Sequence, residues 1–135
     1  MDEQNNLSIP VKDLTGAEPL ELAKEIVRIL DRRKADDIKL LHVTEKTILA
    51  DYFVICNGTS STHIKALVDE VDKQLSEAGE PPVRREGLRS DIWVLMDFGC
   101  VIVHVFTDEA RKFYDLERLW ADAENIDISD IIIPE

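Results

Sequence analysis

The first half of the chain carries two kinds of apolar pattern, which predict alternating helices and strands. Apolar residues recur at three- and four-residue spacing over residues 15–37 and again over residues 62–79, so each segment is predicted to form an amphipathic helix. Between them, residues 38–43 and 52–57 are short, mostly apolar runs of the kind that form buried strands. This half is therefore predicted to fold as a helix, two strands and a helix.

The second half of the chain is richer in strands and ends in a helix. Residues 83–86 follow two prolines and predict a short extended segment, whereas residues 91–97 and 100–107 carry strong strand patterns separated by a tight turn. Residues 108–120 return to helical spacing. The predicted order is α-β-β-α-β-β-β-α, which indicates a single α/β domain with one mixed sheet and flanking helices.

Composition divides the chain into three segments. Residues 1–14 lack a sustained period and are predicted to be a flexible N-terminal arm. Residues 15–121 hold every predicted element and form the domain. Residues 122–135 form an acidic tail with three consecutive isoleucines, residues 131–133, near its end. This tail is expected to fold back onto an apolar groove or to stay disordered; alternatively, it adds a strand to the sheet edge of another copy.

The chain of 135 residues is strongly acidic, with a formal net charge of −12 from 28 acidic and 16 basic residues. Sequence-specific binding to nucleic acid is not expected, because contacts with a phosphate backbone need clustered Lys and Arg. A basic protein is a better partner, although an acidic surface is often only solvated. No apolar run approaches the roughly 20 residues of a membrane span, so we expect no membrane partner. We predict a cytoplasmic protein with reduced Cys56 and Cys100.

Residues 58–61, Gly-Thr-Ser-Ser, lie where a predicted strand passes into a helix, a position at which backbone N–H groups often bind phosphate. Nucleotidyl transfer also needs carboxylates held together on a strand to bind divalent metal ions. The next acidic residues, Asp69, Glu70 and Asp72, are spread around a predicted helix instead. We therefore expect no enzyme, no cofactor and no metal. The alternative is a nucleotidyltransferase-like enzyme or a nucleotide-binding regulator that uses this turn.

The hairpin formed by the last two strong strands has two different faces. If Phe98 and Gly99 form its turn, Trp93 lies opposite His104. One face is then wholly apolar and must cover the core: Ile92, Val94, Met96, Val101, Val103 and Val105. The other face mixes large apolar and polar groups: Trp93, Leu95, Asp97, Ile102, His104 and Phe106. In a three-layer protein this mixed face is a second core, whereas with helices on one side only it is an exposed patch for a partner.

Residues 50–71, residues 86–106 with the string WVLMDFG, and residues 109–120 with YDLERLW together resemble the ribosomal silencing factor family, whose members are also called Iojap-like or RsfS proteins. The resemblance covers roughly residues 18–121, which is most of the chain. It implies a fold related to nucleotidyltransferases without their activity. That implication agrees with the missing strand carboxylates.

The resemblance also implies a function and a binding surface. It implies a factor that binds the large ribosomal subunit through ribosomal protein uL-fourteen, sterically blocks subunit joining, and represses translation under nutrient limitation. The binding surface of the family maps here onto Trp93, Asp97, Phe98, Gly99, Arg111 and Tyr114. Trp93 and Phe98 would supply apolar anchors. Cys100 departs from the Asp of many relatives, and a homodimer supported by the apolar end of the tail is a further possibility.

Overall fold

The computed structural model describes residues 13–45, 47–87 and 92–132 of the chain. The elements, in chain order, are α1 (Pro19–Arg32), β2 (Asp36–His42), β3 (Tyr52–Gly58), α2 (Ser61–Glu77), β4 (Arg84–Glu86), β5 (Trp93–Asp97), β6 (Val101–Thr107), α3 (Asp108–Tyr114), α4 (Leu116–Leu119) and β7 (Glu124–Asn125). Most of the predicted N-terminal arm falls on residues 1–12, which lie outside the described residues.

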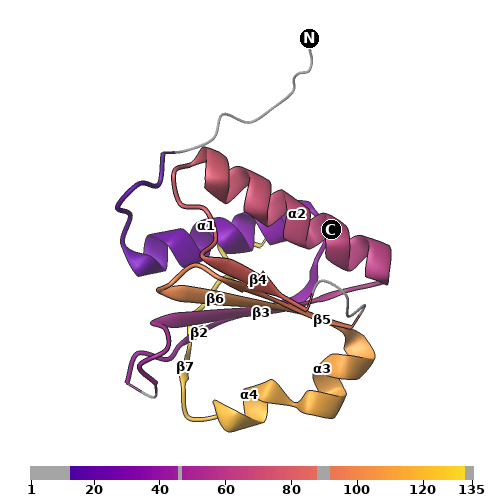
Figure 1. Ribbon diagram of the computed structural model, residues 1–135. Helices are drawn as coiled ribbons and strands as arrows, with labels where there is room; N and C mark the ends of the chain where they lie inside the picture. The colour runs from indigo at the N-terminus through magenta and orange to yellow at the C-terminus, as the bar shows by residue number, and fades with distance from the viewer. Residues whose placement is uncertain (1–12, 46, 88–91, 133–135) are drawn as a thin grey trace.

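The strands form one mixed sheet in the order β4-β5-β6-β3-β2-β7. Strands β3 and β6 run parallel at its centre, and the other neighbouring strands are antiparallel. Helices α1 and α2 cover one face of the sheet, and α3 and α4 cover part of the other (Figure 1). The molecule therefore has three layers, and its two central strands are buried on both faces.

The predicted α/β fold and element order are confirmed, with one refinement and one addition. The last helix is divided, because Asp115 adopts a left-handed φ of 49° that ends α3 and precedes α4. The acidic tail adds strand β7, in which Glu124 and Asn125 pair with His42 and Leu41 of β2. The tail thus extends the sheet of its own chain.

The main core lies between the sheet and helices α1 and α2. The two helices contribute an apolar stripe each, made of Leu22, Ala23, Ile26, Val27, Ile29 and Leu30 from α1 and Ile64, Leu67, Val68, Val71 and Leu75 from α2. Leu14, which was predicted to belong to the arm, is also buried in this core, and its N–H donates to the carbonyl of Ala78 (2.8 Å). The domain therefore begins before Thr15.

The tail crosses the edge of the sheet and packs on the main core. After β7, Ile126, Ile128 and Ile132 lie partly buried against it, and Ile131 is buried. Ile133 lies outside the described residues. The structure thus favours the fold-back expected for the tail. Within the described ranges, no helix combines the length and the apolar content needed to cross a membrane.

A second, smaller core lies between the other face of the sheet and residues 108–119, which we call the α3–α4 layer. Its buried members are Leu41, Val43, Ala50, Phe53, Ile55, Ile102, Phe106, Ala110 and Ala123. Trp93, Leu95, Leu116 and Trp120 pack against it but are only partly buried. The mixed face of the hairpin is therefore a second core whose margin remains open to solvent.

The register of the β5–β6 hairpin differs from the predicted one by two residues. Trp93 lies opposite Phe106 rather than His104, and Asp97 lies opposite Ile102. The cause is a longer connection, in which the N–H of Phe98 donates to the carbonyl of Val101 (2.9 Å). Because side chains alternate with a period of two, this shift leaves each residue on its predicted face.

His104 is buried on the second-core face of β6, and burial lowers the pKa of its imidazole from 6.5 to about 4. The unfolded chain therefore binds a proton more readily than the folded one as pH falls below 6.5. We expect about 3 kcal/mol of unfolding free energy to be lost between pH 6.5 and pH 4 through this group. Urea unfolding across this pH range measures the loss.

His104→Gln is the control for that measurement, because it removes the titration but keeps an acceptor for the indole N–H of Trp93. The stability of the variant should depend less on pH than that of the wild type over the same range. Equal slopes for the two proteins would contradict a buried neutral His104.

Phe98 belongs to the main core, since only 7% of the residue is exposed. The family resemblance instead implied that Phe98 is an open apolar anchor. Phe98→Ala should therefore lower the free energy of unfolding by about 3–5 kcal/mol, because it leaves a cavity in a packed core. Denaturant unfolding at neutral pH measures this free energy. A loss below about 1 kcal/mol would contradict the burial of Phe98 in the core.

Candidate functional site

The structure divides the predicted site residues between the two ends of β5. Trp93 is the first residue of the strand. Asp97 is its last residue, and Phe98 and Gly99 lie in the turn that follows. Asp97 lies four positions after Trp93 along the extended strand, a distance of about 13 Å. Tyr114 lies at the Trp93 end, with ring centroids 4.9 Å apart. The predicted surface is therefore two separate places, of which the first holds the exposed aromatic groups.

The turn at the far end of β5 is built for its own stability. The carboxylate of Asp97 accepts from the N–H of Gly99 (2.7 Å) and from Nε of Arg84 (3.2 Å). Gly99 has a φ of 87°, a left-handed conformation that glycine adopts without strain. Phe98 points into the main core. These contacts give the turn a structural role, and the side chain of Phe98 is not open to a partner.

An aromatic cluster forms the Trp93 end of the site. The indole of Trp93 stacks on Phe106 (centroids 4.9 Å apart), and its Nε1–H donates to Nδ1 of His104 (3.1 Å). Tyr114 covers the indole from α3, and Phe113 lies beside Tyr114 at 5.1 Å. The Phe113 residue is 81% exposed. The cluster thus extends from Phe106 in the second core to the solvent-exposed ring of Phe113.

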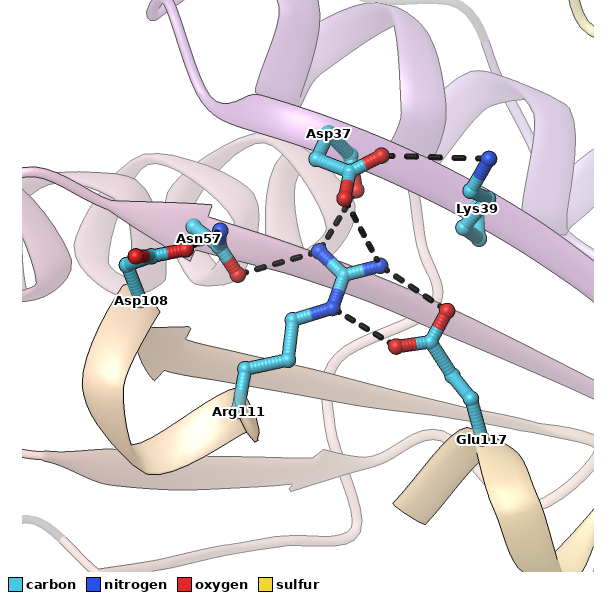
Figure 2. A network of polar contacts seen from close by, with 6 residues as sticks. All are labelled: Asp37, Lys39, Asn57, Asp108, Arg111 and Glu117. Atoms are coloured by element: carbon cyan, nitrogen blue, oxygen red, sulfur yellow. Dashed lines mark hydrogen bonds and ion pairs between the residues drawn. The ribbon is translucent and has the colours of Figure 1, made fainter. Parts of the chain in front are cut away.

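Arg111, three positions before Tyr114 in α3, is buried, with only 6% of the residue exposed. Its Nε and Nη2 donate to the two carboxylate oxygens of Glu117 (2.8 and 3.2 Å). Its Nη1 donates to the carbonyl of Asp37 (2.6 Å) and to Oδ1 of Asn57 (3.0 Å), as Figure 2 shows. The amide of Asn57 in turn donates to Asp108 at 3.4 Å. One guanidinium therefore joins α3, α4, β2 and β3.

The network explains how two short helices keep a fixed position. Hydrogen bonds from Arg111 lower the pKa of Glu117 below its usual value, so the carboxylate stays charged in its ion pair. The left-handed conformations of Asp37 and Asp115 turn the backbone so that Asp37 offers its carbonyl and α4 can follow α3. Arg111, predicted to be at the surface, is a positioning residue for Tyr114 and its neighbours.

The Gly-Thr-Ser-Ser turn is occupied by side chains of the protein itself. The N–H of Thr59 donates to Nδ1 of His63 (2.9 Å), and the N–H of His63 donates to Oγ of Ser60 (3.1 Å). A Cβ at Gly58 would lie 2.7 Å from Cγ1 of Ile64, so the glycine allows α2 to pack closely. Two of the donors that could bind a phosphate are therefore already used, and the glycine has a packing role.

Three acidic residues of α2, Asp69, Glu70 and Asp72, are ion-paired. Arg85 binds Asp69 (3.0 Å) and Asp72 (2.7 Å), and Arg33 binds Glu70 (2.6 Å). Across the described part of the chain, no group of three or more His, Cys, Asp and Glu side chains is placed to hold a metal ion. The arrangement lacks the carboxylate cluster that nucleotidyl transfer uses.

Sequence reasoning missed several exposed apolar residues on this side of the sheet. Phe113 and Leu119, the latter 75% exposed, project from α3 and α4, and Ile48 and Leu49 are exposed in the loop between β2 and β3. Helical spacing in residues 108–120 predicted one continuous helix. The break at Asp115 changes which positions face outward, and no pattern in the sequence marked it.

Comparison with known proteins agrees with the fold. The family model described as "Ribosomal silencing factor during starvation" matches residues 16–135. A ribosomal silencing factor of Halalkalibacterium halodurans is 37% identical over 112 residues, covering 83% of this chain and 96% of its own. A mouse protein named mitochondrial assembly of ribosomal large subunit protein 1 is 37% identical over 98 residues, which cover 70% of this chain and 43% of its own.

Solved structures give the same result. A crystal structure of a protein from Chromobacterium violaceum has a TM-score of 0.75 and 38% identity, covering 77% of this chain and 87% of that one. A second, from Bacillus halodurans, has a TM-score of 0.71 and 34% identity, covering 80% of this chain and 98% of that one. With the family model extending over residues 16–135, these similarities show that the chain belongs to the ribosomal silencing factor family.

Proposed function

We propose that this protein binds the large ribosomal subunit through ribosomal protein uL-fourteen and blocks its joining with the small subunit. Repression of translation under nutrient limitation would follow, in the cytoplasm where subunits join. The names of the relatives support a ribosomal role, since they refer to ribosome silencing and to assembly of the large subunit. The observation that carries the proposal is the aromatic cluster of Trp93, Phe113 and Tyr114, formed where β5 meets the α3–α4 layer.

This cluster has the features of a binding surface. Aromatic residues with one buried and one exposed side are common energetic centres of interfaces, because they offer large apolar area with few rotatable bonds. The Arg111 network holds the layer in place before binding, which reduces the entropy lost on association. We call the exposed surface formed by Trp93, Phe113, Tyr114 and Leu119 the docking face.

The mechanism is steric, so no bond needs to be made or broken. A factor held on the joining face of the large subunit excludes the small subunit by its volume alone. A stable complex needs an interface of about 1,000 Å² or more of total buried surface. The net charge of −12 favours a basic ribosomal protein and disfavours direct contact with rRNA. Raising the salt concentration should therefore weaken the complex.

A reconstituted system tests the proposal. The purified protein should co-sediment with isolated large subunits at a ratio of one to one, bind isolated uL-fourteen, and reduce subunit joining without any nucleotide. Mg²⁺-dependent nucleotide hydrolysis or transfer, together with no binding to subunits, would overturn it. That result would favour the alternative function at the Gly-Thr-Ser-Ser turn.

Phe113→Ala is the sharpest variant of the docking face, because the side chain projects from α3 and is largely exposed. We expect it to weaken binding to large subunits by about 2 kcal/mol, roughly thirtyfold, with no change in the free energy of unfolding. Trp93→Ala should lower both the affinity for large subunits and the free energy of unfolding, because the indole also contacts Phe106 and His104. Equilibrium sedimentation and urea unfolding of each variant separate the two effects.

Ser60→Ala is the matched control away from the docking face. Its hydroxyl caps α2, so the variant should lose about 1 kcal/mol of stability and keep its affinity for the subunit. The reverse pattern, in which Ser60→Ala abolishes binding by a folded protein and Phe113→Ala does not, would move the binding site to the Gly-Thr-Ser-Ser turn.

A further inference from the structure

The loop between β2 and β3 presents two adjacent aliphatic side chains to solvent. Ile48 is fully exposed, and Leu49 is 68% exposed. A single exposed aliphatic residue is ordinary, but neighbouring ones on a protein surface often mark a contact with a partner. These two residues had no place in the function implied by the family resemblance.

The described residues of this loop, 43–45 and 47–51, are held by hydrogen bonds within the loop. The N–H of Val43 donates to the carbonyl of Asp51 (2.8 Å), and the hydroxyl of Thr44 donates to the Asp51 carboxylate (3.2 Å). The N–H of Leu49 donates to Oγ1 of Thr47 (3.1 Å). The loop therefore has a defined conformation before any partner binds. Little additional conformational entropy is lost when its exposed side chains make contact with a partner.

The base of the loop is continuous with the α3–α4 layer. Val43 and Ala50, on either side of the exposed pair, are buried in the second core. Leu116 and Trp120, at the two ends of α4, pack against this same core. The loop and α4 also lie on the same side of the sheet in Figure 1. The exposed apolar surface can thus extend from Phe113 through Leu119 to Ile48 and Leu49.

Charge selects the kind of partner. Glu45, Lys46 and Asp51 are the charged residues that flank the two aliphatic residues in the chain, and the whole molecule carries a net charge of −12. A second copy would bring like charges together, and an anionic membrane surface would repel the loop in the same way. A basic protein surface with an apolar depression satisfies both the carboxylates and the aliphatic side chains.

We propose that Ile48 and Leu49 form a second anchor of the docking face, which enters an apolar depression bordered by basic residues on the same large-subunit protein that α3 contacts. The inference rests on the proposed function and deepens it. It assigns to the partner a contact wide enough to extend from α3 to the β2–β3 loop. Two anchors at opposite ends of the layer would also fix the orientation of the factor on the subunit.

Affinity measurements with purified large subunits test the second anchor. The double variant Ile48→Ser and Leu49→Ser should bind about thirtyfold more weakly than the wild type, mainly through faster dissociation. Its unfolding midpoint should be unchanged, because both side chains are exposed. Val83→Ser is the matched control, an aliphatic residue 73% exposed beside β4 at the opposite edge of the sheet, and it should bind like the wild type.

Crosslinking identifies the partner. A photo-reactive benzoylphenylalanine at position 48 should capture the same large-subunit protein as one at position 113. Unchanged affinity of the double variant, or capture of different proteins by the two probes, would overturn the inference; a loss of binding by Phe113→Ala would then leave the proposed function standing. Failure of the wild type to bind subunits at all would remove both.

Two further measurements distinguish the other occupants. Phosphatidylglycerol vesicles that bind the wild type and release the double variant would assign the loop to a membrane. A dimer seen by mass measurement across a dilution series, and lost only in the double variant, would assign it to a second copy. Either result would overturn the inference, whereas no vesicle binding and an unchanged mass would support it.

Discussion

Arg111 buries its guanidinium between a helix and the sheet, and the position of the α3–α4 layer depends on that contact. A buried cation is costly unless its donors find acceptors, and here Nε, Nη1 and Nη2 all do. The acceptors come from Asp37, Asn57 and Glu117, on three other elements. Removing one member would leave an unpaired buried charge at a cost of about 3–5 kcal/mol. Helices of seven and four residues are too short to be stable without such support.

The two faces of the sheet consequently have different roles. The face under α1 and α2 carries the larger core, with a continuous apolar stripe from each helix, and it supplies most of the stability. The α3–α4 face buries fewer residues and leaves Trp93, Leu116 and Trp120 partly open. Large apolar groups can be displayed there because the rest of the fold does not depend on covering them. The same thin packing predicts that this layer opens more readily than the central strands.

Much of the fold could be predicted from local patterns. The predicted face of each hairpin residue was correct even though the predicted register was displaced by two residues. A shift of two keeps each side chain on the same face, because side chains alternate between the two faces of a sheet. The family resemblance placed Trp93 beside Tyr114, and the structure brings their rings together. The acidic residues that follow the Gly-Thr-Ser-Ser turn were also expected on one helix, and Asp69, Glu70 and Asp72 lie on α2.

Other features of the site depend on contacts between distant residues. Arg111 finds two of its three acceptor residues 74 and 54 positions away, so no local signal showed that this arginine is buried. Phe98 follows a strand, but the longer turn sends its side chain back into the core. The exposure of Phe113 results from the break at Asp115, a left-handed residue that period and composition do not reveal. Tertiary geometry, rather than residue type, determines these positions.

Under the proposed function, the layer held by Arg111 is the surface that meets the ribosome. Hydrogen–deuterium exchange of the protein, free and bound to purified large subunits, tests it directly. Binding should slow exchange in residues 108–120 and in the loop at residues 47–51, and should leave residues 59–70 at the start of α2 unchanged. Slowed exchange at the start of α2, with none in α3 and α4, would contradict the claim.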